Sequence, residues 1–481
     1  MLKRLFKSVR EYKLLSILTV VFMIGEAAIE CLIPFITANL IDTLENSVRN
    51  GTEGMLPSVI KTGLILVLMA LVSLMFGGAA SITSAKASTG FAKNLRHDIF
   101  SKIQTYSFQN IDKFSSSSLV TRMTTDITNV QMSYMMIIRI AVRAPMLLIF
   151  SIIMAYIMGG ALATSFVVVI PLLGFGLLIV AKKAMPAFRR VFKKYDRLNE
   201  SIEENVRATR VVKGFAREPF EKQKFSDASD DIRKDFTKAE RIVALNTPLM
   251  QFCVHFNMIF VLMVGSKLIV SSGGAAINVG EMSAMLTYGM QILMQLMMLS
   301  MIYVMLTMSG ESMKRIAEVL DEESSLTNPE NPVTEVNDGS IEFKNVRFKY
   351  SKTAKKYSLS DVNLKIKSGM TVGIIGGTGS SKSTLVQLIP RLYDVTEGEV
   401  LVGGRNVKEY DIEALRNTIS FVLQKNLLFS GTINENLRWG NENATQEEII
   451  EACKLAQADD FVRSFPEGYE THIEQGGTNV S

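Results

Sequence analysis

The stretch Gly376-Gly-Thr-Gly-Ser-Ser-Lys-Ser-Thr384 directly follows the apolar run Met370-Thr-Val-Gly-Ile-Ile375. The apolar run predicts a strand, and a strand that opens into a loop of the pattern G-x-x-x-x-G-K-[ST] is typical of a phosphate-binding site. Gly376 and Lys382-Ser383 match this pattern, but Ser381 occupies the position of its second glycine. The alternative is a glycine- and serine-rich turn with a chance Lys-Ser pair. We predict a phosphate-binding loop, because strand, loop and helix follow one another in the order that the motif requires.

Each residue type in this loop has a physical reason to be there. Backbone N–H groups of the loop and of the next helix's first turn point at anionic oxygens. Lys382 is expected to reach the outer phosphates, and the Ser383 hydroxyl is expected to hold Mg²⁺. The Cβ atom of Ser381 is expected to loosen the cradle, because glycine is normally used where the backbone approaches a ligand or takes a positive φ. The predicted nucleotide-binding residues of the loop are Gly376, Gly377, Thr378, Gly379, Ser380, Ser381, Lys382, Ser383 and Thr384.

Much of the remaining chain is apolar. It has 481 residues, 48% of them hydrophobic, and its mean hydropathy is +0.22. A membrane-spanning helix needs roughly 20 mostly apolar residues. The stretches that meet this length are Leu14–Leu40, Gly63–Ile82, Met135–Met158, Ala161–Ala181, Leu245–Val270 and Met282–Met308. We therefore predict an α-helical membrane domain of six transmembrane helices, which excludes a purely soluble ATPase.

Other features of the composition narrow the class of protein. No signal peptide with a small-residue cleavage site precedes the first span. The cysteines, Cys31, Cys253 and Cys453, show no paired or metal-ligand spacing, so we expect neither disulfides nor zinc. The net charge of +5 does not indicate a nucleic-acid partner, because lysine and arginine lie where a membrane protein places them.

Lysines and arginines are unevenly distributed between the loops. They are numerous before the first span and after the second and fourth spans, whereas Ser271–Glu281 contains none. Because cytoplasmic loops carry the excess of basic residues, both termini are predicted to be cytoplasmic in a multi-pass protein of the cytoplasmic membrane. One helical stripe precedes the first span and consists of Leu2, Leu5, Phe6 and Val9. It predicts either a helix on the inner membrane surface or a solvated helical cap.

The connections after the second and fourth spans are each some dozens of residues long and keep helical periodicity. At 1.5 Å per residue, helical hairpins of this length would project on the order of 30 Å into the cytoplasm. Their predicted tips are Asp112–Ser118 and Phe215–Glu221.

A turn-rich linker, Thr327–Gly339, separates the spans from a soluble domain. Ile341–Phe343 and Val400–Val402 predict short strands, and Ile419–Leu423 predicts a buried one. Thr445, with a glutamate three residues later, predicts a capping box at the start of a helix. The predicted organisation is a transmembrane domain over 1–320, a linker over 321–338, and an α/β P-loop nucleotide-binding domain over 339–481.

The whole chain resembles one half of an ATP-binding-cassette (ABC) exporter, in which six spans with two long intracellular hairpins precede a cassette. Tyr350 resembles the aromatic residue that stacks on adenine, and residues 376–384 resemble the Walker A loop. Gln424 resembles the Q-loop glutamine, which contacts Mg²⁺ and faces the transmembrane helices. Leu119–Asp126 and Val211–Glu218 resemble the segments around the two coupling helices. The resemblance implies ATP and Mg²⁺ as ligands, with Mg²⁺ held by Ser383 and Gln424.

In this family the signature motif begins at Asn479-Val480-Ser481, and the resemblance makes Ser481 its serine and a further nucleotide-binding residue. The Walker B aspartate, the catalytic carboxylate and the switch histidine of the family are not found in the sequence. We therefore expect an incomplete cassette, truncated at the signature motif, that does not hydrolyse ATP by itself and whose catalytic residues are unassigned.

The segment Thr471-His-Ile-Glu-Gln-Gly-Gly477 departs from the commoner family pattern G-E-x-G. In this it resembles the subunit with the weakened ATP site in heterodimeric bacterial multidrug exporters. The resemblance implies that a second, unlike half-transporter is the partner of this chain.

Two features inside the spans bear on a transport pathway. Glu26 and Glu30 lie one helical turn apart in the first span, where carboxylates are costly and usually face a cavity or a partner. They predict either a cation-attracting surface in the pathway, or pairing with Arg139 or Arg143, or a position near the membrane interface. The sixth span is rich in methionine, whose flexible side chain adapts to different apolar ligands. Most of these methionines are expected to face lipid or the core, and those at a spacing that shares one face are Met290, Met294, Met297, Met301 and Met305.

The main hypothesis is ATP-driven, multidrug-type export of hydrophobic or amphipathic, including cationic, compounds by an ATP-hydrolysing dimer. ATP would bind between two cassettes and favour their closed state over the open one. The alternatives are a lipid or peptide exporter, and a nucleotide-sensing regulatory or channel subunit that does not pump. Substrate-stimulated ATPase activity would distinguish the pump from the sensor.

Overall fold

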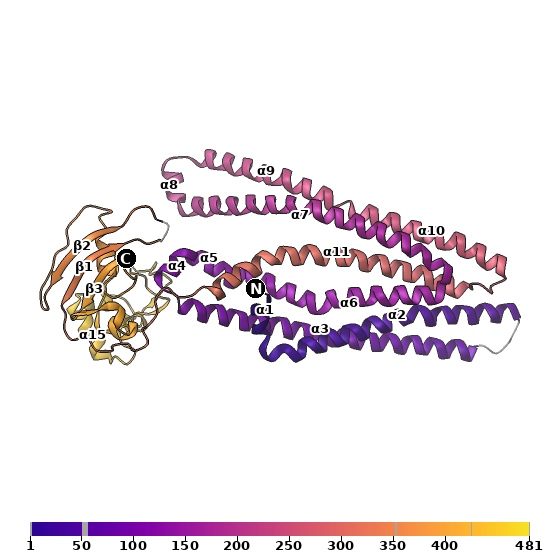
Figure 1. Cartoon of the computed structure of the whole chain (residues 1–481), viewed down its shortest axis with the longest axis horizontal. Helices are drawn as coiled ribbons and strands as arrows, with labels where there is room; N and C mark the ends of the chain where they lie inside the picture. Colours follow the sequence, from indigo (N-terminus) through magenta and orange to yellow (C-terminus); the bar gives the residue numbers. More distant parts are fainter. Residues whose placement is uncertain (1, 51–55, 352–353, 425, 481) are drawn as a thin grey trace. The chain divides into compact units, whose positions relative to one another are not determined.

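The computed structural model describes residues 2–50, 56–351, 354–424 and 426–480. The chain divides into two compact units. Figure 1 labels helices and strands of each unit. The first unit comprises Met1–Tyr106 and Asn110–Ser325, and the second comprises Ser107–Gln109 and Leu326–Ser481. All the long helices belong to the first unit, whereas the β-strands belong to the second.

The first unit is built from helices joined by short turns. In chain order they are α1 (Leu2–Leu5), η1 (Phe6–Tyr12), α2 (Lys13–Asn50), α3 (Leu56–Gln104), α4 (Phe108–Phe114), α5 (Ser116–Thr121), the π-helical turn η2 (Arg122–Asp126), α6 (Ile127–Gly159), η3 (Gly160–Ala163), α7 (Thr164–Arg207), α8 (Thr209–Gly214), α9 (Glu218–Val243), α10 (Asn246–Ser272) and α11 (Val279–Asp321).

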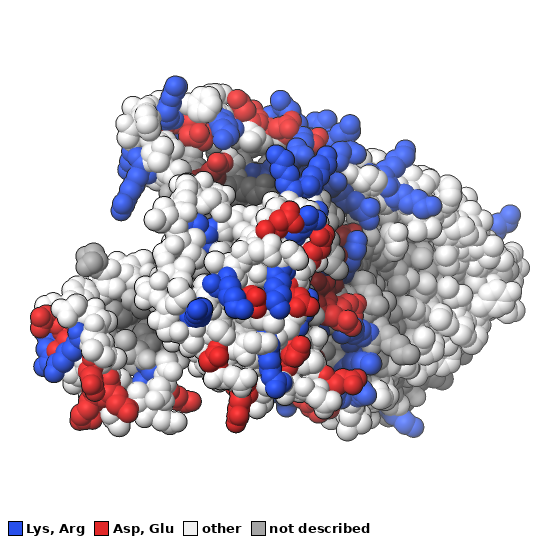
Figure 2. Space-filling model, turned by 60° about the vertical axis from the view of Figure 1, so that its left-hand side comes forward, with Lys and Arg blue, Asp and Glu red and all other residues white. Residues whose placement is uncertain are grey.

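Six helical stretches among the described residues are long and apolar enough to cross a membrane. They are Phe6–Asn46, Leu56–Gln104, Ser116–Gly159, Thr164–Val206, Glu218–Ser272 and Val279–Asp321. Each contains or overlaps one of the spans predicted from the sequence, so the prediction of six transmembrane helices is confirmed. Figure 2 shows a broad area of surface with few charged side chains, as spans in lipid require, beside an area where lysine, arginine, aspartate and glutamate gather.

The helices of the first unit pack around two main hydrophobic cores. Helix α2 contacts α3 and α6, and α11 contacts α6, α2, α7 and α10. One core surrounds Phe91 and Leu95 of α3 and Ile316 of α11. The other surrounds Tyr288 of α11, which is fully buried and donates its hydroxyl to the carbonyl of Cys31 at 2.8 Å. The burial of this hydroxyl is tolerated because it is hydrogen-bonded.

Both predicted hairpins are present. In the second, α7 and α9 run side by side with α8 near their turn (Figure 1), and the chain reverses between the end of α8 and Glu218, within the predicted tip. The predicted tip of the first hairpin was only partly right. It has a break at Ser115, where φ is +59°, but helix α3 already ends at Gln104. The segment Thr105–Ser107 that follows contains no glycine or proline, the usual signals of a turn.

The apolar stripe near the N-terminus packs into the protein. Leu5 and Val9 are 2% and 5% exposed and belong to the same core as α3. Ser8 and Arg10 hydrogen-bond Asp98 of α3, each at 2.6 Å. This part of the stripe therefore faces its own unit rather than the membrane surface or solvent, which were the two alternatives drawn from the sequence.

The second unit contains an antiparallel sheet with the strand order β2-β1-β3-β4 and a two-stranded sheet, β5-β6. Its strands are β1 (Ile341–Phe348), β2 (Leu359–Ile366), β3 (Glu397–Val402), β4 (Arg405–Asn406), β5 (Gly431–Thr432) and β6 (His472–Ile473). Its helices are α12 (Lys382–Gln387), η4 (Val407–Glu409), α13 (Ile412–Thr418), α14 (Ile433–Leu437), α15 (Gln446–Leu455), α16 (Asp459–Arg463) and η5 (Gly468–Glu470). Two predicted strands and the predicted capping box at Thr445 are thereby confirmed.

Two other strand predictions are wrong. Neither Met370–Ile375 nor Ile419–Leu423 forms a strand, and the second segment is not buried. Ile375 and Val422 are 98% and 84% exposed. The apolar residues are present in both segments, but a strand also needs a hydrogen-bonded neighbour, and neither segment has one among the described residues.

Part of the predicted linker is fixed to the second unit. Helix α11 ends at Asp321, and the second unit begins at Leu326. Val333 exchanges backbone hydrogen bonds with Glu409 and Asp411, each at 2.9 Å, and the carbonyl of Thr327 accepts from the buried Arg391 at 3.2 Å. Residues from Thr327 to Val333 are therefore held by the cassette rather than loose.

Candidate nucleotide-binding site

The predicted phosphate loop leads directly into helix α12, which begins at Lys382. Ser381 caps this helix with a left-handed backbone, at φ +61° and ψ 26°. Gly379 also has a positive φ, of +81°. A Cβ atom added at Gly376 would lie 2.7 Å from the Ser380 hydroxyl, so that position has no room for a side chain without a shift. The loop thus uses the conformations for which its glycines are suited, but it places a serine in one of them.

The side chain of Lys382 folds back onto the phosphate loop. Its ammonium group donates to the carbonyls of Gly376 at 2.8 Å and Gly377 at 2.9 Å, and to the Ser380 hydroxyl at 3.3 Å. These contacts hold the lysine at the centre of the loop. An ammonium group there supplies the positive charge that nucleotide phosphates require, and the first turn of α12 adds N–H groups that have no partner within the helix.

Tyr350 lies beside helix α12, and its stacking on adenine stays a prediction. Its hydroxyl hydrogen-bonds Thr384 at 2.8 Å and Gln387 at 3.4 Å, both on α12. Its ring makes T-shaped contacts with Phe348, at a centroid distance of 4.8 Å, and with Tyr393, at 5.2 Å. Tyr350 remains 41% exposed, so a base could still reach it. The buried Tyr393, which packs against this ring, was not predicted from the sequence. An aromatic residue shortly after a helix does not indicate which distant residue it will contact.

The other predicted site residues are less constrained. Ser383 and Gln424 are both exposed. Their shared role as ligands of Mg²⁺ stays a prediction. Thr378 is also exposed, whereas Thr384 is only 5% exposed. Ser481 lies outside the described residues. Within the described ranges, no group of histidine, cysteine and carboxylate side chains could hold a metal ion. A hydroxyl, an amide and phosphate oxygens are, however, the hard oxygen ligands that suit Mg²⁺.

The donor set of the loop fits a nucleotide. Lys382 and the N–H groups of α12 suit its phosphates, the exposed Ser383 hydroxyl suits Mg²⁺, and Tyr350 suits its base. The Thr384 hydroxyl is buried and hydrogen-bonds Tyr350, so its predicted contact with the nucleotide stays a prediction. All of these residues except Tyr350 come from one continuous segment. The donor groups that a nucleoside triphosphate requires are therefore gathered mainly in one segment of the chain.

Comparison with known proteins shows the family of this chain. The family described as the ABC transporter transmembrane region matches residues 16–297, which is more than half of the chain, and the ABC transporter domain matches residues 359–473. The chain belongs to the ABC transporter family. It is 33% identical to the uncharacterized ABC transporter ATP-binding protein YfiB of Bacillus subtilis over 474 residues, or 98% of this chain and 80% of that protein. It is 31% identical to the uncharacterized ABC transporter ATP-binding protein Rv1273c of Mycobacterium tuberculosis, over 100% of this chain and 81% of that protein.

The solved structure of a bacterial Atm1-family ABC exporter with ATP bound shares the fold of this ABC transporter chain. The TM-score is 0.80 at 21% sequence identity, over 98% of this chain and 81% of the other. The chain therefore has the fold of an exporter-type half-transporter, with six apolar helices followed by a nucleotide-binding domain. The matched domain implies an ATP-hydrolysing, ATP- and Mg²⁺-using transporter, and half-transporters of this family sit in the bilayer and typically dimerise.

Ser381→Gly is expected to tighten nucleotide binding at this site. A non-glycine residue in the left-handed region costs about 1 kcal/mol or more, and glycine removes that cost. The strain lowers affinity to the extent that the loop relaxes away from the φ of +61° when no nucleotide is bound, and full relaxation makes the relief of about 1 kcal/mol equal to roughly fivefold tighter binding. Photolabelling of this chain with 8-azido-ATP, in competition with MgATP, measures the change. Unchanged affinity would show that the serine is tolerated equally in the free and bound loop.

Proposed function

We propose that this chain is one half of an ATP-driven exporter of hydrophobic or amphipathic compounds, with both termini in the cytoplasm. The observation that carries the proposal is the presence of six apolar spans and a nucleotide-binding loop in one chain with an exporter fold. The uneven distribution of lysine and arginine supports the orientation. ATP binding between this cassette and that of a partner would favour one state of the spans over the other.

The methionines of α11 support an adaptable, apolar substrate. Met290, Met294, Met297 and Met301 follow one another at helical spacing and are 38–55% exposed in the single chain. By contrast, Met285 of the same helix is fully buried. A stripe of exposed thioethers on a span can repack around ligands of different shape.

The carboxylates of the first span give weaker support to a cationic substrate. Glu30 and Glu26 lie 2.5 Å and 3.6 Å from the guanidinium group of Arg143 on α6. Pairing with Arg143, one of the alternatives drawn from the sequence, is therefore the arrangement in the structure. Arg139, one turn before Arg143 on α6, also interacts electrostatically with Glu26, so the remaining argument for attraction of cations is only the position of two carboxylates within a span.

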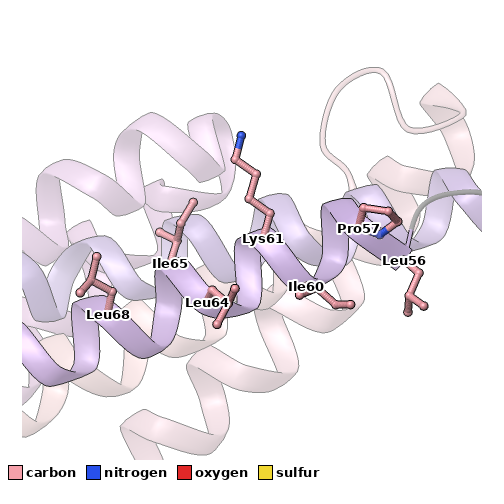
Figure 3. A pocket seen from close by; sticks show the side chains of 7 residues that line it. All are labelled: Leu56, Pro57, Ile60, Lys61, Leu64, Ile65 and Leu68. Atoms are coloured by element: carbon pink, nitrogen blue, oxygen red, sulfur yellow. The ribbon is translucent and has the colours of Figure 1, made fainter.

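An apolar groove on α3 suits lipid rather than a transported compound. It is lined by Leu56, Pro57, Ile60, Lys61, Leu64, Ile65 and Leu68, whose side chains Figure 3 shows along one stretch of the helix. Leu56, Leu64 and Leu68 are each at least 60% exposed, and the groove lies on a span. Open apolar surface of this kind is what acyl chains cover in a bilayer.

We propose that the partner is an unlike half-transporter whose cassette completes the ATP sites. The proposal rests on the altered segment at Glu474–Gly477 and on the serine in the strained position 381. Expression of the full-length protein with an affinity tag in its native host is expected to co-purify a second ABC chain with a different sequence. An active homodimer without that second chain would contradict the proposal.

A nucleotide-sensing subunit that does not pump is the second candidate, and the strained phosphate loop favours it. ATPase activity of the purified full-length complex in lipid vesicles separates the two. Stimulation of ATP hydrolysis by lipophilic compounds supports the exporter. ATP binding without stimulated hydrolysis or transport supports the sensor.

A further inference from the structure

One face of helix α7 is exposed along much of its length. Successive residues of an α-helix are about 100° apart, so residues three, four or seven positions apart share a face. On the opposite face, Val169, Leu173 and Val180 are at most 8% exposed. The exposed face therefore lies outside the core of the first unit. Within the span it carries four apolar side chains that are 39–69% exposed, namely Val168, Leu172, Phe175 and Ile179.

The same face becomes basic where the apolar stretch ends at Ala181. The sequence contains no aspartate or glutamate between Thr164 and Tyr195. Figure 2 shows lysine and arginine side chains along the upper border of the area that has few charges. The basic residues of the face are all exposed, and they are Lys182, Lys183, Arg189, Arg190 and Lys193. The face thus changes from apolar to positively charged within about one turn.

The charge next to the span is not neutralised by ion pairs. Lys194, farther along α7, lies 2.7 Å from both Asp231 and Asp235 of α9. Arg190 also interacts electrostatically with Asp235. Among the described residues, however, no carboxylate forms an ion pair with Lys182 or Lys183. Helix α9 therefore compensates the part of the face toward the hairpin tip and leaves the two lysines beside the span without an acidic partner in the described part of the chain.

The length of the apolar part fits one leaflet of a bilayer. Val168 and Ile179 are eleven positions apart, which corresponds to about 16 Å along a helix at about 1.5 Å per residue. The hydrocarbon core of a bilayer is about 30 Å thick, so one leaflet contributes about half of this length. Lys182 and Lys183 follow at the depth of the phosphate groups. Lysine suits this depth, because its stem can lie on apolar surface while its ammonium group reaches the polar layer.

We propose that this face of α7 is a binding site for an anionic phospholipid, with an acyl chain along residues 168–179 and the phosphate held by Lys182 and Lys183. Arg189 and Arg190 lie about 10 Å farther from the span, within reach of the headgroup's charge. They attract a headgroup with a net negative charge and repel the cationic group of a zwitterionic lipid. The site therefore selects an anionic lipid over a zwitterionic one.

The inference depends on the proposed function only for the orientation, which places Lys182 in the cytoplasmic leaflet. Anionic lipids of that leaflet attract basic segments next to a span. The site needs neither ATP hydrolysis nor transport, so it can be tested without them.

The test uses the full-length protein with its partner in vesicles of phosphatidylcholine. A fluorophore attached through Ile179→Cys reports which lipid lies beside the site, and the cysteines of the described chain are buried and so protected from the label. Quenching by nitroxide-labelled phosphatidylglycerol is compared with quenching by nitroxide-labelled phosphatidylcholine. The apparent affinity is expected to be about fivefold or more higher for phosphatidylglycerol, since each basic side chain near an anionic headgroup contributes about this factor.

A second labelled position shows whether the preference is local. Ile82 is 59% exposed at the inner end of the second predicted span, and the residues that follow it, 83–85, are uncharged. A fluorophore attached through Ile82→Cys is expected to show little preference between the two lipids. An equal preference at both labelled positions would reflect a general attraction of anionic lipid and overturns the inference.

Three double variants test the role of the two lysines. Lys182→Gln with Lys183→Gln is expected to reduce the preference at Ile179→Cys to the level of the α3 position. Lys182→Arg with Lys183→Arg keeps the charge and should keep the preference, which separates loss of charge from a defect in folding. Lys222→Gln with Lys224→Gln removes two exposed lysines of α9 near the hairpin tip, and this matched control is expected to behave as wild type.

Two further results would contradict the inference. A preference that survives Lys182→Gln with Lys183→Gln shows that these lysines do not bind the lipid. No quenching at Ile179→Cys by either lipid shows that the partner chain covers this face instead. Because the assay contains no ATP, loss of lipid selectivity leaves the proposed export intact, and a failure of transport leaves the lipid site intact.

Discussion

Lys382→Ala is expected to weaken binding of MgATP to this chain by about 10- to 100-fold, because a hydrogen bond to a charged group contributes about 1.5–3 kcal/mol. In the structure the ammonium group bridges two loop carbonyls and a hydroxyl, and so lies where phosphate oxygens would enter. Its removal takes away the main positive charge of the loop. Photolabelling of this chain with 8-azido-ATP, in competition with MgATP, measures the affinity even when a partner contributes a second site.

Two further variants show whether the effect belongs to the geometry of the loop. Lys382→Arg keeps the charge but replaces a compact ammonium group by a planar fork, so we expect an intermediate loss of affinity. Lys365→Ala removes a lysine from β2 whose side chain is 72% exposed, and it should leave the affinity unchanged. Equal labelling of all three variants and the wild type would mean that nucleotide does not bind at residues 376–384.

The sequence predicted features that depend on local residues. The six spans follow from uninterrupted apolar length, and the capping box at Thr445 follows from two residues three positions apart. The strain at Ser381 also followed from its place in the loop pattern, and the φ of +61° agrees with it. Each of these features can be predicted without knowing which residues of the folded chain pack against it.

Features that depend on a distant partner were not predictable. Met370–Ile375 has the composition of a strand, but no neighbouring strand pairs with it among the described residues. Asn110 and Asp126 are ordinary polar residues in helical segments of the sequence, which are normally solvated. Their burial depends on α11, about two hundred residues later in the chain, and is visible only in the packed structure.

The choice between Arg139 and Arg143 for the carboxylates of the first span also required the structure. Both arginines lie on α6, one turn apart, and the sequence does not fix the rotation of that helix against α2. Arg143 lies 2.5 Å from Glu30, and its side chain is 29% exposed within a span. Replacement of Glu26 and Glu30 by glutamine therefore strips a partly buried guanidinium group of its charged partners. The free energy of unfolding is expected to fall by about 3–5 kcal/mol. Thermal unfolding of the purified full-length protein, together with its level in the membrane, measures this loss.

A compensating change separates a stabilising role of these carboxylates from a role in transport. If the loss arises from the stripped arginine, adding Arg143→Gln to the double variant removes the unpaired charge and should restore most of the stability. Glu45→Gln, at an exposed position on the same helix α2, controls for loss of a carboxylate and should have no effect. With stability restored, transport of a lipophilic cation and of a neutral compound should be equal to each other. The contrary result is much weaker transport of the cation than of the neutral compound at normal protein levels. It would show that the carboxylates act mainly in the substrate pathway and not in the ion pair with Arg143.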